Sequence, residues 1–273
     1  MSNMLSPIDF RHMDYPEVFE DEVNRLADLI ASSRHFYKLS VEVLKNSAYW
    51  NSDNFQDKFR DFFSHFNIIS PISENDVSLF CKRLSGCFTY AENYEVMGKI
   101  RGLLAEKIVE CAFHRSLAKH KFSYLETGCA VLLYEEEIRY VCNKTNAKKE
   151  RCTSDNISCE QDCKGEKRTV DIGTRIIFPN SNAKGLKFEF LFAEIKVLPK
   201  GFHYLDWAYL KQLDVALKQT NFSNTIFLVT FGSKKLMDIR IQSYNDHTFS
   251  VRLLGVDEIE KMLYENEEQN EEL

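Results

Sequence analysis

Three charged residues in two apolar segments of the chain could act together on one substrate. In residues 187–198, Glu194 and Lys196 are two positions apart, so an extended strand places both side chains on one face. The preceding apolar segment, residues 169–178, carries Asp171. A charge buried within such a hydrophobic run is costly unless it is paired or binds a metal ion. These three residues are therefore the first candidates for chemistry.

A divalent cation would explain why two carboxylates share one site. A hairpin between the two segments would bring Asp171 near Glu194, where their negative charges would repel each other. Hard oxygen ligands suit Mg²⁺ or Mn²⁺, and such an ion would polarise a phosphate group and lower the pKa of a bound water. Lys196 would orient the nucleophile or stabilise developing negative charge. The pattern thus predicts hydrolysis of a phosphodiester.

The same residues also allow a purely structural interpretation. Glu194 and Lys196 could form an ion pair on the same face of an edge strand, and Asp171 could cap a turn. Such pairs occur by chance in many chains, so the ordered set of elements around them has to decide between the two interpretations.

That ordered set resembles the PD-(D/E)xK, or restriction-endonuclease-like, nucleases over about residues 97–232. Asp171 matches the first carboxylate of the motif, and Glu194 and Lys196 match the (D/E)xK element. The resemblance implies two further active-site residues, Glu106 on the helix before the sheet and Gln212 on the helix after the ExK strand. The motif's proline is replaced by valine, and this position varies in the family.

The resemblance implies an α/β fold with a mixed central sheet flanked by helices, as in the restriction-endonuclease-like core. It implies a Mg²⁺-dependent endonuclease that cleaves DNA, with RNA less favoured. By analogy, such a compact nuclease fits a restriction or antiviral defence effector that works with a partner ATPase or helicase, or as a homo-oligomer. The alternatives are a catalytically inactive nuclease-fold subunit that binds protein or nucleic acid, and an accessory to a transposase or recombinase.

Apolar periodicity divides the chain into three regions. Residues 1–95 are mainly helical, residues 96–256 form the expected nuclease core, and residues 257–273 form an acidic C-terminal helix or tail. Within the core we expect helices at 97–119 and 203–219, and strands at 124–134, 138–141, 169–178, 187–198, 225–231, 237–242 and 248–254.

A polar insert rich in cysteine, residues 142–168, interrupts the core. Four of its residues, Cys142, Cys152, Cys159 and Cys163, could hold a structural Zn²⁺ through their thiolates. The spacing lacks a CxxC pair, so a loop with reduced cysteines stays open as an alternative, and a disulfide is the least favoured. The insert also carries seven Lys or Arg residues that could touch a phosphate backbone or a partner subunit.

The charge is distributed unevenly. The net charge is −6, but the last 17 residues alone contribute −7, so the remainder is nearly neutral. A neutral body predicts modest affinity for nucleic acid, because phosphate neutralisation supplies most non-specific binding. This balance favours a nuclease that depends on a partner or on oligomerisation. The N-terminus lacks a signal peptide and no apolar run is long enough to span a membrane, so we expect a soluble cytoplasmic protein.

Overall fold

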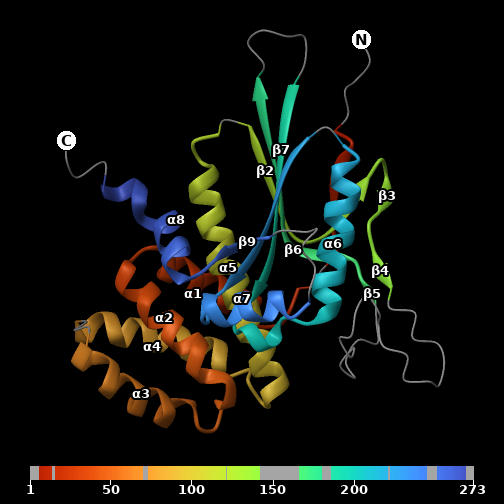
Figure 1. The fold of residues 1–273 in the computed structure, drawn as a ribbon. Helices are drawn as coiled ribbons and strands as arrows, with labels where there is room; N and C mark the ends of the chain where they lie inside the picture. Colours follow the sequence, from red (N-terminus) through yellow and green to blue (C-terminus); the bar gives the residue numbers. More distant parts are fainter. Residues whose placement is uncertain are drawn as a thin grey trace, which may run out of the picture. The chain divides into compact units, whose positions relative to one another are not determined.

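The computed structural model describes residues 6–13, 16–69, 73–120, 122–141, 166–179, 186–220, 222–244 and 251–268. The chain divides into two compact units, which we treat separately. Figure 1 labels their helices and strands. The sheet unit comprises residues 1–14 and 117–254, and the helical unit comprises residues 15–116 and 255–273. The long helix that we expected to open the nuclease core therefore groups with the helical unit instead.

The sheet unit is built on a mixed seven-stranded sheet with the strand order β1-β2-β6-β7-β8-β9, and β3 pairs with β2. Its strands are β1 (Ile8–His12), β2 (Ser123–Leu133), β3 (Glu136–Glu137), β6 (Thr169–Pro179), β7 (Leu186–Lys196), β8 (Ser223–Thr230) and β9 (Arg252–Leu254). The first three neighbouring pairs are antiparallel, whereas β7–β8 and β8–β9 are parallel. A separate two-stranded ribbon pairs β4 (Tyr140–Val141) with β5 (Glu166–Lys167).

Helices make the two parallel connections, since parallel neighbours cannot be joined by a tight turn. After the short η2 (Pro199–Gly201), α6 (Tyr204–Lys218) links β7 to β8, and α7 (Lys234–Gln242) links β8 to β9. Apolar side chains of α6 pack onto those of β7 and β8 in one buried cluster. Its fully buried members include Phe190, Phe192, Leu210, Leu213 and Leu228. The mixed α/β class expected from the sequence is confirmed.

Strands β2, β6, β7 and β8 lie within two residues of their predicted positions, whereas β1 was not predicted. The antiparallel register of β6 and β7, which runs from Ile172–Ala193 to Pro179–Leu186, confirms that these two strands are hairpin partners. Strand β7 lies between β6 and β8. The edge-strand position proposed in the structural interpretation of Glu194 and Lys196 is therefore wrong.

The strand predicted at 237–242 is also wrong, because α7 occupies this segment. Ser233 caps the helix by accepting a hydrogen bond from the Leu236 amide, which satisfies a donor that no helical carbonyl can reach. Apolar residues at every second position, Met237, Ile239 and Ile241, are a pattern typical of a strand. In the helix, however, Ile239 is exposed and Met237 is the buried residue. The cap at Ser233 and the burial of Met237 therefore favour a helix over the strand that the alternating pattern predicts.

Gly173 on β6 leaves room for an aromatic ring that holds β1 against the sheet. A Cβ atom at this position would lie 2.6 Å from the ring of Phe10 and 2.9 Å from the Sγ of Cys129. Phe10 is in turn 6.1 Å from Phe192, ring centroid to centroid. Close packing of these three side chains therefore depends on the missing Cβ.

We expect Gly173→Ala to lower the free energy of unfolding by about 1–3 kcal/mol, the usual cost of overpacking a core. The matched control is Gly98→Ala, because a Cβ at Gly98 meets nothing within 4 Å and alanine favours a helix. Urea denaturation of both variants checks this. An unchanged midpoint for Gly173→Ala would contradict the close packing around Phe10.

The helical unit comprises α1 (Glu20–Ala31), α2 (Arg34–Asn46), η1 (Ser47–Tyr49), α3 (Phe55–Ile69), α4 (Glu74–Phe88), α5 (Tyr94–Leu117) and α8 (Val256–Glu268). The C-terminal helix α8 is docked by Tyr264, whose hydroxyl donates to the Ile30 carbonyl at 2.6 Å and lies 3.0 Å from the Ser33 carbonyl. The acidic C-terminal helix expected from the sequence is thus part of a folded unit. Among the described residues, no helix combines the length and the apolar character needed to cross a membrane.

Candidate functional site

Glu194 is the centre of a buried charged cluster near the end of β7. The side chain is fully buried, and its Oε1 accepts from the Nζ atoms of Lys196 at 2.6 Å and Lys167 at 2.7 Å. Its Oε2 is also buried, and no hydrogen-bond partner for it lies within the described residues. An unpaired carboxylate oxygen in a sheet interior is costly, and a bound cation would offset this cost.

Asp171 lies where β6 and β7 separate. The regular pairing ends at Ile172–Ala193, and one step further along the ladder Asp171 is opposite Glu194. Here the carboxylate of Asp171 accepts a hydrogen bond from the Ile195 amide at 2.5 Å, in place of a backbone partner. On the other side of Asp171, β2 contains Gly128 with a φ of 50°, a conformation that favours glycine. The backbone is thus irregular on both sides of this carboxylate.

Two residues that the sequence did not single out complete the cluster. Asp206 lies in the first turn of α6, where one carboxylate oxygen accepts from the His203 amide at 2.9 Å and caps the helix. The other oxygen lies 3.2 Å from the Nζ of Lys167 and 3.4 Å from that of Lys196. Both lysines therefore bridge Glu194 and Asp206, and the cluster contains three carboxylates and two ammonium groups.

Burial and the neighbouring charges shift the pKa values of Glu194, Asp206 and both lysines. Burial and the nearby charge of Asp171 raise the pKa of Glu194 to about 7, although the two lysines act in the opposite direction. For Asp206, burial opposes ionisation, but Lys196 and Lys167 outweigh it and hold the pKa below its usual range. Burial also works against the charge of Lys196, yet Glu194, Asp206 and Asp171 together raise its pKa. Both lysines are therefore charged at neutral pH.

The donor set fits a hard divalent cation. Asp171 and the unpaired oxygen of Glu194 are the oxygen ligands that Mg²⁺ prefers, and their mutual repulsion is relieved by a positive ion. Within the described ranges, no group of three Asp, Glu, His or Cys side chains forms a metal-binding set by itself. An ion here would take the rest of its ligands from water and substrate, as protein-bound Mg²⁺ commonly does.

Of the two further predicted residues, Gln212 belongs to the same unit as the cluster and Glu106 belongs to the helical unit. Gln212 lies on α6, six residues after Asp206, which places it on a different face of the helix at about 100° per residue. It is exposed and lines a small pocket instead. Glu106 lies on α5 in the helical unit and is half-buried. Both residues remain predictions as active-site groups.

The predicted zinc ligands Cys142, Cys152, Cys159 and Cys163 lie outside the described residues. Lys167 belonged to the same predicted insert, but β5 places it in the charged cluster. A simple signal could have found it. Lys167 and Asp171 are four residues apart, and in extended chain this spacing places two side chains on one face. Asp206 could have been noticed as an acidic residue in the first turn of the helix that follows the ExK strand.

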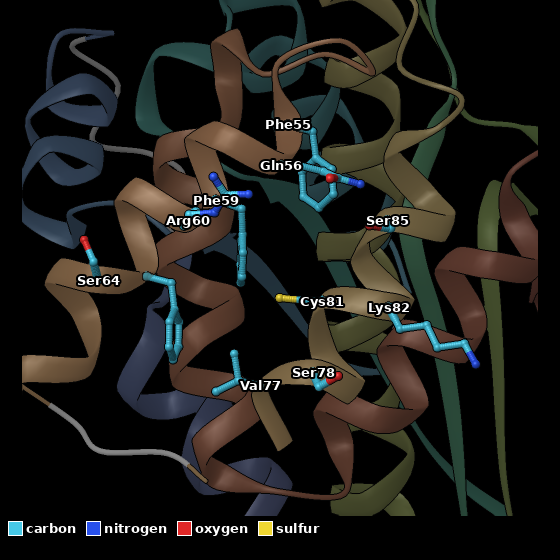
Figure 2. A pocket seen from close by; sticks show the side chains of 11 residues that line it. Phe55, Gln56, Phe59, Arg60, Ser64, Val77, Ser78, Cys81, Lys82 and Ser85 are labelled. Atoms are coloured by element: carbon cyan, nitrogen blue, oxygen red, sulfur yellow. The ribbon is translucent and has the colours of Figure 1, made fainter. Parts of the chain in front are cut away.

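The helical unit has a cavity of its own, of about 550 Å³, between α3 and α4. Figure 2 shows Phe59, Val77 and Cys81 pointing into it. None of its lining residues is acidic, and burial raises the pKa of the Cys81 thiol to about 11, so this cysteine is a poor nucleophile at neutral pH.

No protein-family model and no curated protein sequence matches this chain. Among solved structures, the protein VC1899 from Vibrio cholerae is similar, with a TM-score of 0.42 and 13% sequence identity. The match covers 96% of this chain and 58% of that chain. A likeness at this level carries no functional argument, so function has to be argued from the charged cluster.

Proposed function

We propose that this protein is a metal-dependent nuclease with a restriction-endonuclease-like core, hydrolysing phosphodiester bonds of DNA or, less favoured, RNA. The observation that carries the proposal is the buried and unpaired Oε2 of Glu194, opposite Asp171 on the neighbouring strand. The order of Asp171, Glu194 and Lys196 along the chain supports it. So does the interior position of β7, which keeps these side chains away from a flexible edge.

Each residue has a distinct role in this proposal. Asp171 and Glu194 would hold the cation, with Asp171 oriented beforehand by the Ile195 amide. Bound Mg²⁺ or Mn²⁺ would polarise the scissile phosphate and activate a water molecule. Lys196 is charged at neutral pH, so it would stabilise negative charge on the phosphate rather than accept a proton. Asp206 would hold Lys196 in place through its 3.4 Å ion pair.

A second candidate is a catalytically inactive module that binds protein or nucleic acid. The observation that favours it is the double bridging by Lys167 and Lys196, which compensates Glu194 and Asp206 without any metal. A structural network of this kind would stabilise the junction of β5, β7 and α6. Turnover decides between the two candidates.

The deciding experiment is a cleavage assay on plasmid, single-stranded DNA and RNA, with Mg²⁺, with Mn²⁺ and with EDTA. We expect metal-dependent cleavage by the wild type and none by Glu194→Gln, which keeps the shape of the side chain but weakens metal binding. The matched control is Glu189→Gln, a glutamate on the opposite face of the same strand. Cleavage that persists in Glu194→Gln, or that is lost equally in Glu189→Gln, would contradict the assigned site.

The biological setting is proposed by analogy alone. Outside its acidic C-terminal segment the chain is nearly neutral, which predicts weak intrinsic binding to a phosphate backbone. We therefore propose that a partner ATPase or helicase, or self-association, brings the nuclease to its substrate in restriction or antiviral defence. Repeating the assay across salt concentrations tests the weak binding directly.

A further inference from the structure

A small pocket with aromatic walls lies on the sheet unit between α6 and β4. It has a volume of about 260 Å³, below the usual range for drug-sized ligands, so it suits one small planar group. Four aromatic, two polar and two aliphatic residues line it. They are Tyr140, Tyr204, Trp207 and Tyr244, then Lys211 and Gln212, and finally Ala208 and Val215.

The aromatic rings hold one another in fixed positions. Trp207 and Tyr244 are stacked, with centroids 5.7 Å apart and an interplanar angle of 25°. Tyr204 meets Tyr244 edge-on at 5.8 Å. The hydroxyl of Tyr244 donates to the Phe202 carbonyl at 3.3 Å. A pocket formed in advance loses little conformational freedom when a ligand enters it.

The polar residues add the means to recognise a nucleotide. Gln212 is exposed at the pocket, and its amide can both donate and accept hydrogen bonds, as the edge of a nucleobase requires. Lys211 adds a positive charge that suits a phosphate. Aromatic faces stack on any of the bases, because every base has a π face.

The pocket and the charged cluster are built by the same two elements, the β4–β5 ribbon and α6. On the ribbon, Tyr140 of β4 pairs with Lys167 of β5, whose ammonium group binds Glu194. On α6, Tyr204 and Trp207 line the pocket, while Asp206 between them faces the two lysines. A group bound in the pocket therefore lies on the same two elements that carry Lys167 and Asp206 of the cluster.

We propose that this pocket binds one unpaired nucleobase of a single-stranded nucleic acid whose backbone passes the charged cluster. The inference rests on the proposed nuclease function and names the form of its substrate. A base in a duplex is stacked on both sides and cannot enter such a pocket without being flipped out. The nuclease would therefore prefer single-stranded or locally unwound substrates.

Trp207 provides a direct probe of the pocket. The chain has two tryptophans, and the other, Trp50, is packed among phenylalanines of the helical unit. In a Trp50→Phe protein the fluorescence therefore reports on Trp207 alone. In EDTA, to prevent cleavage, we expect quenching by a hexamer of deoxyadenylate, at least tenfold weaker binding of AMP, and no quenching by the hexamer within a duplex.

Variants on α6 connect the signal to the pocket. In the same background, Tyr204→Leu is expected to weaken binding of the hexamer about tenfold or more, the usual effect of losing one base-stacking ring. Gln212→Ala is expected to weaken binding of the hexamer several-fold. Because Gln212 is exposed, this variant keeps the test valid if Tyr204→Leu fails to fold. Lys218→Ala is the control, because this lysine lies on the same helix, pairs with Asp214 and is not part of the pocket lining.

The outcomes separate the two proposals. No quenching by the single strand, equal binding of AMP or duplex, or unchanged affinity in both pocket variants would overturn the pocket assignment. If cleavage still requires Glu194, the nuclease proposal survives that failure. Quenching by the hexamer without any metal-dependent cleavage would support the pocket assignment and overturn the nuclease proposal.

Discussion

Replacing Lys196 by methionine is expected to slow metal-dependent cleavage by about 10²–10³-fold, the usual effect of removing one group that stabilises transition-state charge. Methionine keeps the length of the apolar stem and removes only the ammonium group. Because Lys196 is held charged by Glu194 and Asp206, the loss is electrostatic and should not be recovered by raising the pH. Single-turnover cleavage rates at saturating Mn²⁺ measure the effect.

Metal affinity distinguishes this role from that of a ligand. Lys196 competes with a cation for Glu194, so Lys196→Met should bind Mn²⁺ at least as tightly as the wild type. Isothermal titration with Mn²⁺ checks this, and Lys218→Met serves as a control that changes neither rate nor affinity. If Lys196→Met lost Mn²⁺ binding in proportion to its rate, the lysine would be supporting the ligands rather than the reaction.

The buried carboxylate of Glu194 should make the metal-free protein less stable as the pH rises. Its pKa is about 7 in the folded protein against an ordinary value of 4.5, so the folded state binds this proton more tightly than the unfolded chain does. Stability from this group is therefore present below about pH 4.5 and is lost as the pH rises through about 7.

The measurement is urea unfolding in EDTA at several pH values between 4.5 and 8, followed by the fluorescence of Trp207 in the Trp50→Phe background. This signal reports on the sheet unit alone, which matters because two compact units need not unfold together. Glu194→Gln should lack the pH-dependent loss, whereas Glu189→Gln should follow the wild type. Parallel curves for the wild type and Glu194→Gln would contradict the raised pKa.

Added Mn²⁺ should reverse the loss at neutral pH, because a ligand that binds only the folded state stabilises it. The reversal should be absent in Glu194→Gln. The pH dependence and the metal response thus test the same carboxylate oxygen in two independent ways, one without the metal and one with it.

Local patterns were sufficient to place the three central residues together. Strand periodicity puts Glu194 and Lys196 on one face, and the hairpin partner of this strand carries Asp171. Both inferences depend on neighbours in sequence and on a side-chain repeat of two, which survives in any tertiary context. The same local rules predicted α6 closely, because its apolar residues recur along one face and bury against β7 and β8.

Only the tertiary structure decided what surrounds those three residues. Lys167 and Asp206 enter the cluster because the ribbon of β4 and β5 and the start of α6 pack beside β7. Strand β1 joins the sheet by pairing with β2, more than a hundred residues away. Gln212 faces an aromatic pocket rather than the carboxylates, since the position of a side chain around a helix depends on where the helix docks. Such long-range contacts produce no periodic pattern in the sequence. The charges that they bring together nevertheless determine the pKa of Glu194 and the chemistry proposed for it.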